Sequence, residues 1–412
     1  MENDTKEEQR WGMERIACHS LWLEFLEYKT DKMLLSKKEE EQLRDYIQNK
    51  RYLPMAEKIL QGNFHFSIPE KRELNKMGST KKRIVYRFKE EENILLKMIS
   101  WLLYEYDDCI SDNCYSFRKN TGARKAFLAM ANNREIENLH GFKADISNYF
   151  NSIDISLLLP MLQQVLANNP LLFEILKDLL LDDRAIWQGE IISEKRGVMA
   201  GTPTSPFLAN LYLREMDQYF EAQNIFYARY SDDILIFAPE KLLMTQVEEY
   251  GNFLKKYKLT SNPEKEEYFT PGEKWHFLGF EYQNGIVDIS PVATRKLMNK
   301  IRRYAKSLRR WSLRKKISPE QSLRIFNRKF NKKFYDKQSG RQLCWSRWYF
   351  PMINTDRTLY VIDKYMQDWQ RYVVTGKHNK ANYRKVSYEI LKSCGYRPLV
   401  SAYYESSPWR KD

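Results

Sequence analysis

Three acidic residues have the type and the surroundings that metal-dependent phosphoryl transfer requires. Asp232 and Asp233 stand between two short apolar runs, Phe226–Tyr230 and Ile234–Phe237, which predict two strands joined by a tight hairpin. Two carboxylates on a buried hairpin repel each other and raise each other's pKa, and a divalent cation removes that conflict. Hard oxygen ligands suit Mg²⁺. Asp145, at the end of another predicted core strand, supplies a third carboxylate.

A pair of adjacent aspartates also has a plain structural interpretation. Asp107-Asp108 and Asp182-Asp183 each end a predicted helical stretch beside a loop, where such pairs are common. Asp232-Asp233 differs because predicted strands flank it and because Asp145 lies in a similar setting. Two metal ions about 4 Å apart, one at the attacking oxygen and one at the leaving pyrophosphate, require such a set of carboxylates. This chemistry needs no nucleophilic side chain, and no Ser-His or Cys-His signature is evident.

The elements that must position these carboxylates alternate along the middle of the chain. Residues 141–147 alternate as a strand, 155–181 have helical periodicity, 197–206 form a turn-rich loop, and 207–219 are again helical. Helices are concentrated at both ends of the chain. The middle is therefore predicted to be an α/β domain.

Six short motifs follow one another in order and at sensible spacing. They are Lys82-Arg83 with Tyr115-Ser116-Phe117-Arg118, Asp145-Ile146-Ser147-Asn148-Tyr149-Phe150, Gly197 to Leu213, Tyr230-Ser231-Asp232-Asp233, Asn262-Pro263-Glu264-Lys265, and Phe277-Leu278-Gly279-Phe280. Together they resemble the motifs of reverse transcriptases of the bacterial type, related to group II intron and retron enzymes. The resemblance covers roughly residues 75 to 345.

The resemblance implies an α/β (α+β) right-hand polymerase fold with fingers, palm and a helical thumb. It places a helical N-terminal extension at residues 1–75, fingers and palm at 76–290, and a basic helical thumb with a C-terminal appendage at 291–412. The implied activity is RNA-directed DNA synthesis. Its partners would be an RNA template, a DNA or RNA primer and dNTPs.

The same resemblance assigns roles to individual residues. Asp145, Asp232 and Asp233 would bind two Mg²⁺ ions, for which Mn²⁺ can substitute. Phe150 would lie beneath the incoming sugar and exclude a 2′-hydroxyl. Lys265 would protonate the leaving pyrophosphate, or would be a solvated surface lysine. The remaining assignments are nucleotide binding by Arg83, Lys82, Arg118, Ala200 and Gly201, and a primer grip of Phe277, Leu278 and Gly279.

One loop departs from the family pattern. Where the family usually has Gly-x-Pro-Gln-Gly, this chain has Gly197-Val198-Met199-Ala200-Gly201. Ala200 cannot make the hydrogen bonds of the Gln side chain, and Met199 lacks the rigid turn of Pro. The loop therefore favours a restricted template or an unusual product over general copying.

The positive charge of the protein lies in its last third. Residues 291–412 contain 30 Lys and Arg and 8 Asp and Glu, whereas residues 1–290 contain 38 and 46. Helical stripes of apolar residues begin after Ser290-Pro291 and after Ser318-Pro319, which predict helix N-termini. The basic side chains of the first helix fall mostly away from its stripe and predict a nucleic-acid-binding face: Arg295, Lys296, Arg302, Arg303, Lys306, Arg309 and Arg310.

Other classes of protein are disfavoured by composition. No run approaches 18 apolar residues, so a membrane-spanning helix is not expected. The first residues lack the basic start and apolar stretch of a signal peptide, which predicts a cytoplasmic protein without a membrane partner. The five cysteines are scattered without a Cys-x-x-Cys pair, which disfavours a zinc finger.

Alternatives remain within the polymerase class. An RNA-copying RNA polymerase shares the palm and the acids, but Phe150 argues against it. A non-catalytic, maturase-like RNA-binding protein would not need all three carboxylates. A retron-type enzyme is the nearest competitor, although Val374-Thr375-Gly376 lies too far past the primer grip to match a retron tripeptide. We expect copying of one dedicated non-coding RNA, with antiviral defence as a candidate role.

Overall fold

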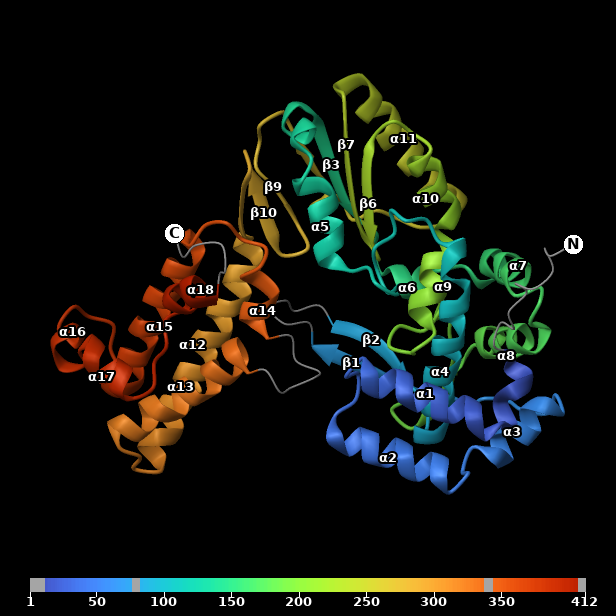
Figure 1. Cartoon of the computed structure of the whole chain (residues 1–412), viewed down its shortest axis with the longest axis horizontal. Coiled ribbons are helices and arrows are strands. Elements are labelled where there is room, and N and C mark those ends of the chain that lie inside the picture. The colour runs from blue at the N-terminus through green and yellow to red at the C-terminus, as the bar shows by residue number, and fades with distance from the viewer. Residues whose placement is uncertain (1–11, 76–81, 337–343, 407–412) are drawn as a thin grey trace, which may run out of the picture. The chain divides into compact units, whose positions relative to one another are not determined.

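The computed structural model describes residues 12–75, 82–336 and 344–406 (Figure 1). The chain divides into two compact units, Met1–Glu273 and Lys274–Asp412. Within the described ranges, no helix is both long and apolar enough to cross a lipid bilayer.

The first unit begins with short helices that pack on one another. They are a 3₁₀ helix at Met13–Ala17, α1 (His19–Asp31), α2 (Lys37–Gln48) and α3 (Leu53–Leu60). Ser36 and Glu39 form a capping box that starts α2, in which each side chain bonds the backbone N–H of the other residue. The buried side chains Trp22 and Tyr46 belong to the same hydrophobic core as the central sheet residues described below. The N-terminal helices are therefore an integral part of this unit.

A four-stranded sheet with the order β2-β1-β4-β5 follows along the chain. β1 pairs antiparallel with β2 and parallel with β4, and β4 pairs antiparallel with β5. The bounds are β1 (Glu70–Asn75), β2 (Lys82–Arg87), β4 (Arg184–Trp187) and β5 (Glu190–Ser193). Between β2 and the next sheet lie α4 (Glu90–Leu102), a 3₁₀ helix (Leu103–Cys109), α5 (Ala123–Ala131) and a 3₁₀ helix (Arg134–Asn138).

The central sheet is antiparallel throughout and has the order β6-β7-β3-β8. Its strands are β3 (His140–Asp145), β6 (Phe226–Tyr230), β7 (Asp233–Ala238) and β8 (Glu267–Phe269). The predicted strands at 141–147, 226–230 and 234–237 are thus confirmed to within a few residues. α11 (Glu240–Lys256) packs against β3 and β7 (Figure 1). Ile234 and Leu235 point to opposite faces of β7 and are both fully buried, so both faces of the sheet are covered.

The helical stretches predicted at 155–181 and 207–219 are each divided into two helices. α7 (Ile155–Val165) ends before Asn169, whose side chain accepts a hydrogen bond from the N–H of Leu172 and starts α8 (Pro170–Leu181). Pro170 at the first position of α8 has no N–H and fixes the new start. The other helices are α6 (Tyr149–Ser152), α9 (Ser205–Tyr212), α10 (Arg214–Glu221) and a 3₁₀ helix (Pro263–Lys265).

The second unit joins a small antiparallel sheet to a group of helices. The sheet order is β11-β10-β9, with β9 (Trp275–Phe277), β10 (Phe280–Gln283) and β11 (Ile286–Ile289). The helices are α12 (Pro291–Arg314), α13 (Pro319–Tyr335), α14 (Trp345–Tyr349), α15 (Arg357–Thr375), α16 (Asn382–Lys385), α17 (Tyr388–Ser393) and α18 (Leu399–Ser406).

Both predicted helix starts in this unit are confirmed. The Ser290 hydroxyl accepts from the N–H of Ala293 at 3.3 Å, and the Ser318 hydroxyl accepts from the N–H of Gln321 at 3.2 Å. The apolar stripe of α13 is buried as predicted. In the stripe of α12, Leu297, Ile301 and Leu308 are buried, but Tyr304 is half-buried and Trp311 is 38% exposed.

The predicted domain boundaries after residues 75 and 290 do not coincide with the division into two units. β1 lies before the first boundary, yet all six of its residues pair with β2. β9, β10 and β11 lie before the second boundary, yet they belong to the same unit as the C-terminal helices. Strand pairing therefore joins residues on either side of the first boundary, and the second compact unit begins before the second boundary.

Candidate active site

Strand pairing brings the three aspartates to one edge of the central sheet. Asp145, the last residue of β3, is the register partner of Asp233, the first residue of β7. The N–H of Ile146 donates to the carbonyl of Asp232 at 3.0 Å. The carboxylates of Asp145 and Asp233, 88 residues apart in sequence, are thus neighbours because antiparallel β3 ends where β7 begins.

The turn that carries Asp232 has an unusual backbone conformation. Ser231 lies between β6 and β7 with φ +62°, in the left-handed region that residues other than Gly rarely occupy. This conformation closes the hairpin within two residues. It sets Asp232 and Asp233 beside the end of β3.

The environment of the aspartates is buried and negatively charged. Burial, followed by the charges of Asp232 and Asp145, raises the pKa of Asp233 to about 7. Burial and the charge of Asp145 also raise the pKa of Asp232. The ammonium of Lys265 lies 2.5 Å from the Asp145 carboxylate and offsets part of this charge. The site therefore carries more negative charge than its own lysines neutralise.

This donor set fits a divalent cation chemically. Three carboxylates supply hard oxygen ligands, and a cation between them would relieve the repulsion that raises their pKa values. As the side chains stand, no group of three or more His, Cys, Asp or Glu residues in the described part of the chain is gathered closely enough to hold a metal ion.

The loop Gly197–Gly201 lies between β2 and the turn at Phe150. The carbonyl of Ala200 accepts from the N–H of Tyr86, and the N–H of Ala200 donates to the Asn151 side chain, both at 3.1 Å. At Gly197, with φ +54°, an added Cβ would lie 2.3 Å from the carbonyl oxygen of Phe150. Only glycine fits there, so the loop and the Phe150 turn form one unit.

Phe150 is half-buried and belongs to an aromatic group next to the aspartates. Its ring meets that of Phe117 edge-on, with centroids 6.1 Å apart, and Phe117 lies 6.2 Å from Tyr230. Phe117 is 41% exposed and has φ +59°. Its sequence motif was recognised, but no role was assigned to Phe117, because nothing local indicates that it contacts Phe150.

The predicted nucleotide-binding cations have different surroundings. Arg83 on β2 is exposed, and exposed Lys82 pairs with Glu73 across the β1-β2 hairpin. Arg118 is instead almost buried and donates to the carbonyl of Ser111 at 2.7 Å and to that of Cys114 at 3.4 Å. The Arg118 guanidinium thus closes its own loop, and we expect the exposed Arg83 and Lys82 to reach the triphosphate more readily than Arg118, the third predicted cation.

The predicted primer grip lies in the second unit, at the turn from β9 to β10. Phe277 is buried, while Leu278 and Gly279 both have left-handed backbones, with φ +51° and +94°. The carbonyl of Gly279 accepts from the N–H of Ser290, which ties the turn to the start of α12.

The basic residues of α12 divide into an outer and an inner group. Arg295, Lys296, Arg302, Arg303, Lys306 and Arg310 are exposed, as predicted. Arg309 is partly buried and donates to the carbonyls of Val373 and Val374 at 2.9 and 2.6 Å. These carbonyls end α15, so Arg309 caps that helix. We therefore expect Arg309, predicted to contact nucleic acid, to stabilise α15 instead.

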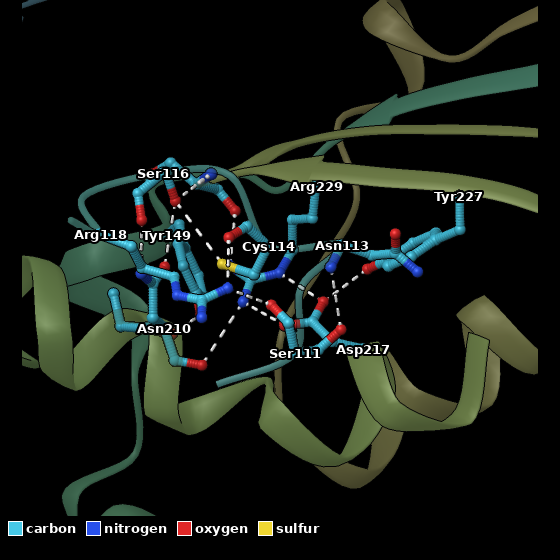
Figure 2. Close-up of polar contacts among 12 residues, drawn as sticks. Ser111, Asn113, Cys114, Ser116, Arg118, Tyr149, Asn210, Asp217, Tyr227 and Arg229 are labelled. Atoms are coloured by element: carbon cyan, nitrogen blue, oxygen red, sulfur yellow. Dashed lines mark hydrogen bonds and ion pairs between the residues drawn. The ribbon is translucent and has the colours of Figure 1, made fainter. Parts of the chain in front are cut away.

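A buried ion pair behind the aspartates was missed by the sequence analysis. Arg229 on β6 and Asp217 on α10 are both fully buried and form two hydrogen bonds, of 2.7 and 2.5 Å (Figure 2). A charged residue within an apolar strand was the available signal, since a buried Arg requires a partner.

An antiparallel sheet with acidic residues on adjoining strand ends, beside a β-hairpin and a glycine-containing loop, defines the palm and fingers of a right-hand nucleic-acid polymerase. The family model of the reverse transcriptase (RNA-dependent DNA polymerase) matches residues 68–282. Because the match covers more than half of the 412 residues, the chain belongs to the reverse transcriptase family and is an RNA-directed DNA polymerase.

Solved structures similar to this chain include two telomerases. Telomerase from Candida albicans, in complex with the TWJ fragment of telomeric RNA, is 12% identical with a TM-score of 0.45, covering 88% of this chain and 69% of that chain. Apo telomerase from Candida tropicalis is 12% identical with a TM-score of 0.47, covering 84% and 68%. A search of curated proteins finds no match.

Proposed function

We propose that the enzyme adds dNTPs by two-metal phosphoryl transfer, with Asp145, Asp232 and Asp233 holding the metals. The observation that carries the proposal is the register of β3 and β7, which sets Asp145 opposite Asp233 and next to Asp232. Two bound Mg²⁺ ions, for which Mn²⁺ can substitute, supply activation of the primer 3′-oxygen and neutralisation of the leaving pyrophosphate.

The protein's own residues prepare the site for these substrates. The Lys265 ammonium lies 2.5 Å from the Asp145 carboxylate and carries a proton that the pyrophosphate can take. Arg83, exposed on β2, is available to the triphosphate, with Lys82 beside it. Ala200 and Gly201 offer only backbone to the nucleotide. Phe150 closes the space beneath the sugar.

Removal of one carboxylate tests the catalytic proposal. Asp145→Asn or Asp232→Asn should cost several kcal/mol of transition-state stabilisation, a rate loss on the order of 10³-fold. Primer extension with purified protein and Mg²⁺ measures the loss. Asp108→Asn, which changes the exposed member of an Asp-Asp pair outside the site, is the matched control. Near-normal extension by either active-site variant would refute the assignment, whereas no extension by the unchanged protein would favour a non-catalytic, maturase-like role.

We further propose that the enzyme is of the bacterial group II intron and retron type and copies one dedicated non-coding RNA in the cytoplasm. The basic residues after residue 290 support tight binding of the RNA. The Met199-Ala200 departure from the family pattern supports copying of a restricted template. Antiviral defence is the role we assign to such copying. A retron-type enzyme is the alternative.

A further inference from the structure

We propose that Ser116 and Arg229 are positioning residues that hold the turn carrying Asp232 in its reactive conformation. The inference rests on the proposed catalytic role of Asp232. The observation that supports it does not depend on that role. Both polar backbone groups of Ser231, the residue before Asp232, form hydrogen bonds with side chains outside the turn.

The N–H of Ser231 is bound by the loop that precedes α5, residues 110–122. It donates to the hydroxyl of Ser116 at 2.9 Å. That hydroxyl donates in turn to the side-chain oxygen of Asn210 on α9 at 3.1 Å, and the Asn210 amide donates to the Ser116 carbonyl at 2.7 Å. Ser116 and Asn210 are buried and are joined in both directions (Figure 2). The acceptor for Ser231 therefore has a fixed position and a fixed hydroxyl orientation.

The carbonyl of Ser231 is bound by the buried arginine. Arg229 uses Nε and one terminal nitrogen on Asp217, and its other terminal nitrogen donates to the Ser231 carbonyl at 3.1 Å. Tyr227 donates a further hydrogen bond to Asp217 at 2.7 Å. The planar guanidinium thus binds Asp217 on α10 and the Ser231 carbonyl at the same time. A lysine ammonium, which is a single point charge, cannot bridge both.

The backbone around Arg229 completes the connection. The N–H of Arg229 donates to the carbonyl of Asn113, and the N–H of Tyr115 donates to the carbonyl of Arg229, each at 2.9 Å. The loop thereby runs alongside β6 as a short parallel bridge between Cys114 and Arg229. A displacement of the loop would therefore move both Arg229 and Ser116, and with them the hydrogen bonds to Ser231.

A left-handed residue needs such support. A non-glycine residue with φ +62° is strained, and surrounding contacts must hold it there. Without its two bonds, the turn at Ser231 would relax toward ordinary backbone angles and shift Asp232 away from Asp145. Small displacements of catalytic groups reduce turnover more than they reduce substrate binding.

Two variants remove the two bonds separately. Ser116→Ala deletes the acceptor of the Ser231 N–H. Arg229→Lys keeps the charge opposite Asp217 but cannot also reach the Ser231 carbonyl. Each should lower kcat on the order of tenfold with little change in KM for primer–template. Ser116→Thr, which keeps the hydroxyl, should restore turnover. Ser111→Ala is the control, because the Ser111 hydroxyl accepts from the N–H of Asn113 within the same loop and not from Ser231.

Hydrogen exchange separates positioning from loss of the fold. In Ser116→Ala and Arg229→Lys, exchange at the Ser231 amide should rise while exchange in β3 stays at the wild-type level. Faster exchange throughout β3 as well would show general destabilisation and overturn the proposal. Unchanged kcat in both variants would also overturn it. If Asp232→Asn retains activity, the proposed function fails; if that variant is inactive while Ser116→Ala turns over normally, only the positioning role fails.

Discussion

Phe150 is held from several sides, which makes its position in the site well defined. Its carbonyl accepts from the N–H of Val198 at 2.9 Å, and its ring contacts Phe117 and Tyr149 edge-on. A side chain fixed in this way can exclude a hydroxyl group by contact, because it has little room to move aside. The proposed sugar discrimination at Phe150 would therefore depend on packing.

Phe150→Val should increase use of rNTPs relative to dNTPs by roughly tenfold or more, because removing the ring relieves a clash with the 2′-hydroxyl. Steady-state incorporation of single nucleotides gives the ratio of kcat/KM values. Tyr149→Phe is a matched control, since it removes only a hydroxyl that bonds the Ala209 carbonyl. An unchanged ratio in an active Phe150→Val enzyme would assign Phe150 to the core.

At the scale of elements, the loop Gly197–Gly201 connects the fingers hairpin to the Phe150 turn through backbone hydrogen bonds. Its contacts to Tyr86 and Asn151 use the backbone of Ala200 and do not depend on a longer side chain at that position. The loop can therefore keep its position without the Gln that the family usually has. What it lacks is a polar side chain directed at the nucleotide.

Gly197→Ala should destabilise the fold more than Gly62→Ala, which serves as its control. Both glycines have left-handed φ values, +54° and +71°, but an added Cβ meets nothing within 4 Å at Gly62. The backbone strain costs about 1–2 kcal/mol in each variant, and the clash at Gly197 adds about 1–3 kcal/mol. Chemical denaturation measures the free energy of unfolding of both variants. Equal losses would mean that the loop moves freely away from Phe150.

The exposed face of α12 should bind duplex nucleic acid through phosphates. Changing Arg302, Arg303 and Arg310 to Gln should weaken binding and reduce the slope of log K against log salt by about 0.9 per lost contact on a B-form duplex. Arg309→Gln should instead lower thermal stability and leave the slope unchanged, because Arg309 caps α15. A slope that stays the same in the triple variant would exclude this face from binding.

At the scale of the whole molecule, charge is distributed unevenly between the two ends of the chain. The region up to residue 290 carries an excess of acidic residues, whereas the region after it carries 30 Lys and Arg against 8 Asp and Glu. The candidate metal-binding aspartates and the basic face of α12 thus lie in different parts of the chain. The same protein can bind metal ions in one part and a polyanion in another.

Immunoprecipitation from native cells should recover one dominant RNA together with DNA complementary to part of it. The strongly basic region can hold an RNA throughout the reaction, and the expectation of a single template rests on the Met199-Ala200 loop. Sequencing of the bound RNA and the new DNA provides the measurement, and an Asp232→Asn strain should retain the RNA but lose the DNA. Templates spread across the transcriptome would contradict a dedicated RNA.

Local patterns in the sequence were sufficient to predict the aspartate-bearing strands, the helix starts at Ser290 and Ser318, and the order of the polymerase motifs. These features depend on residues within a few positions of one another, through alternation, capping and turn chemistry. The resemblance of those motifs implied that Asp145, Asp232 and Asp233 share metal ions, whereas the register that sets Asp145 opposite Asp233 is seen only in the strand pairing.

The partners of individual charged side chains were decided by the tertiary structure. Arg118 and Arg309 resemble surface cations in the sequence, yet each binds backbone carbonyls that only folding brings near. Arg229 finds Asp217 on a separate helix, and Ser116 reaches Ser231 across 115 positions. A buried charge must take whatever partner packing places beside it, and that choice depends on long-range contacts that local sequence does not encode.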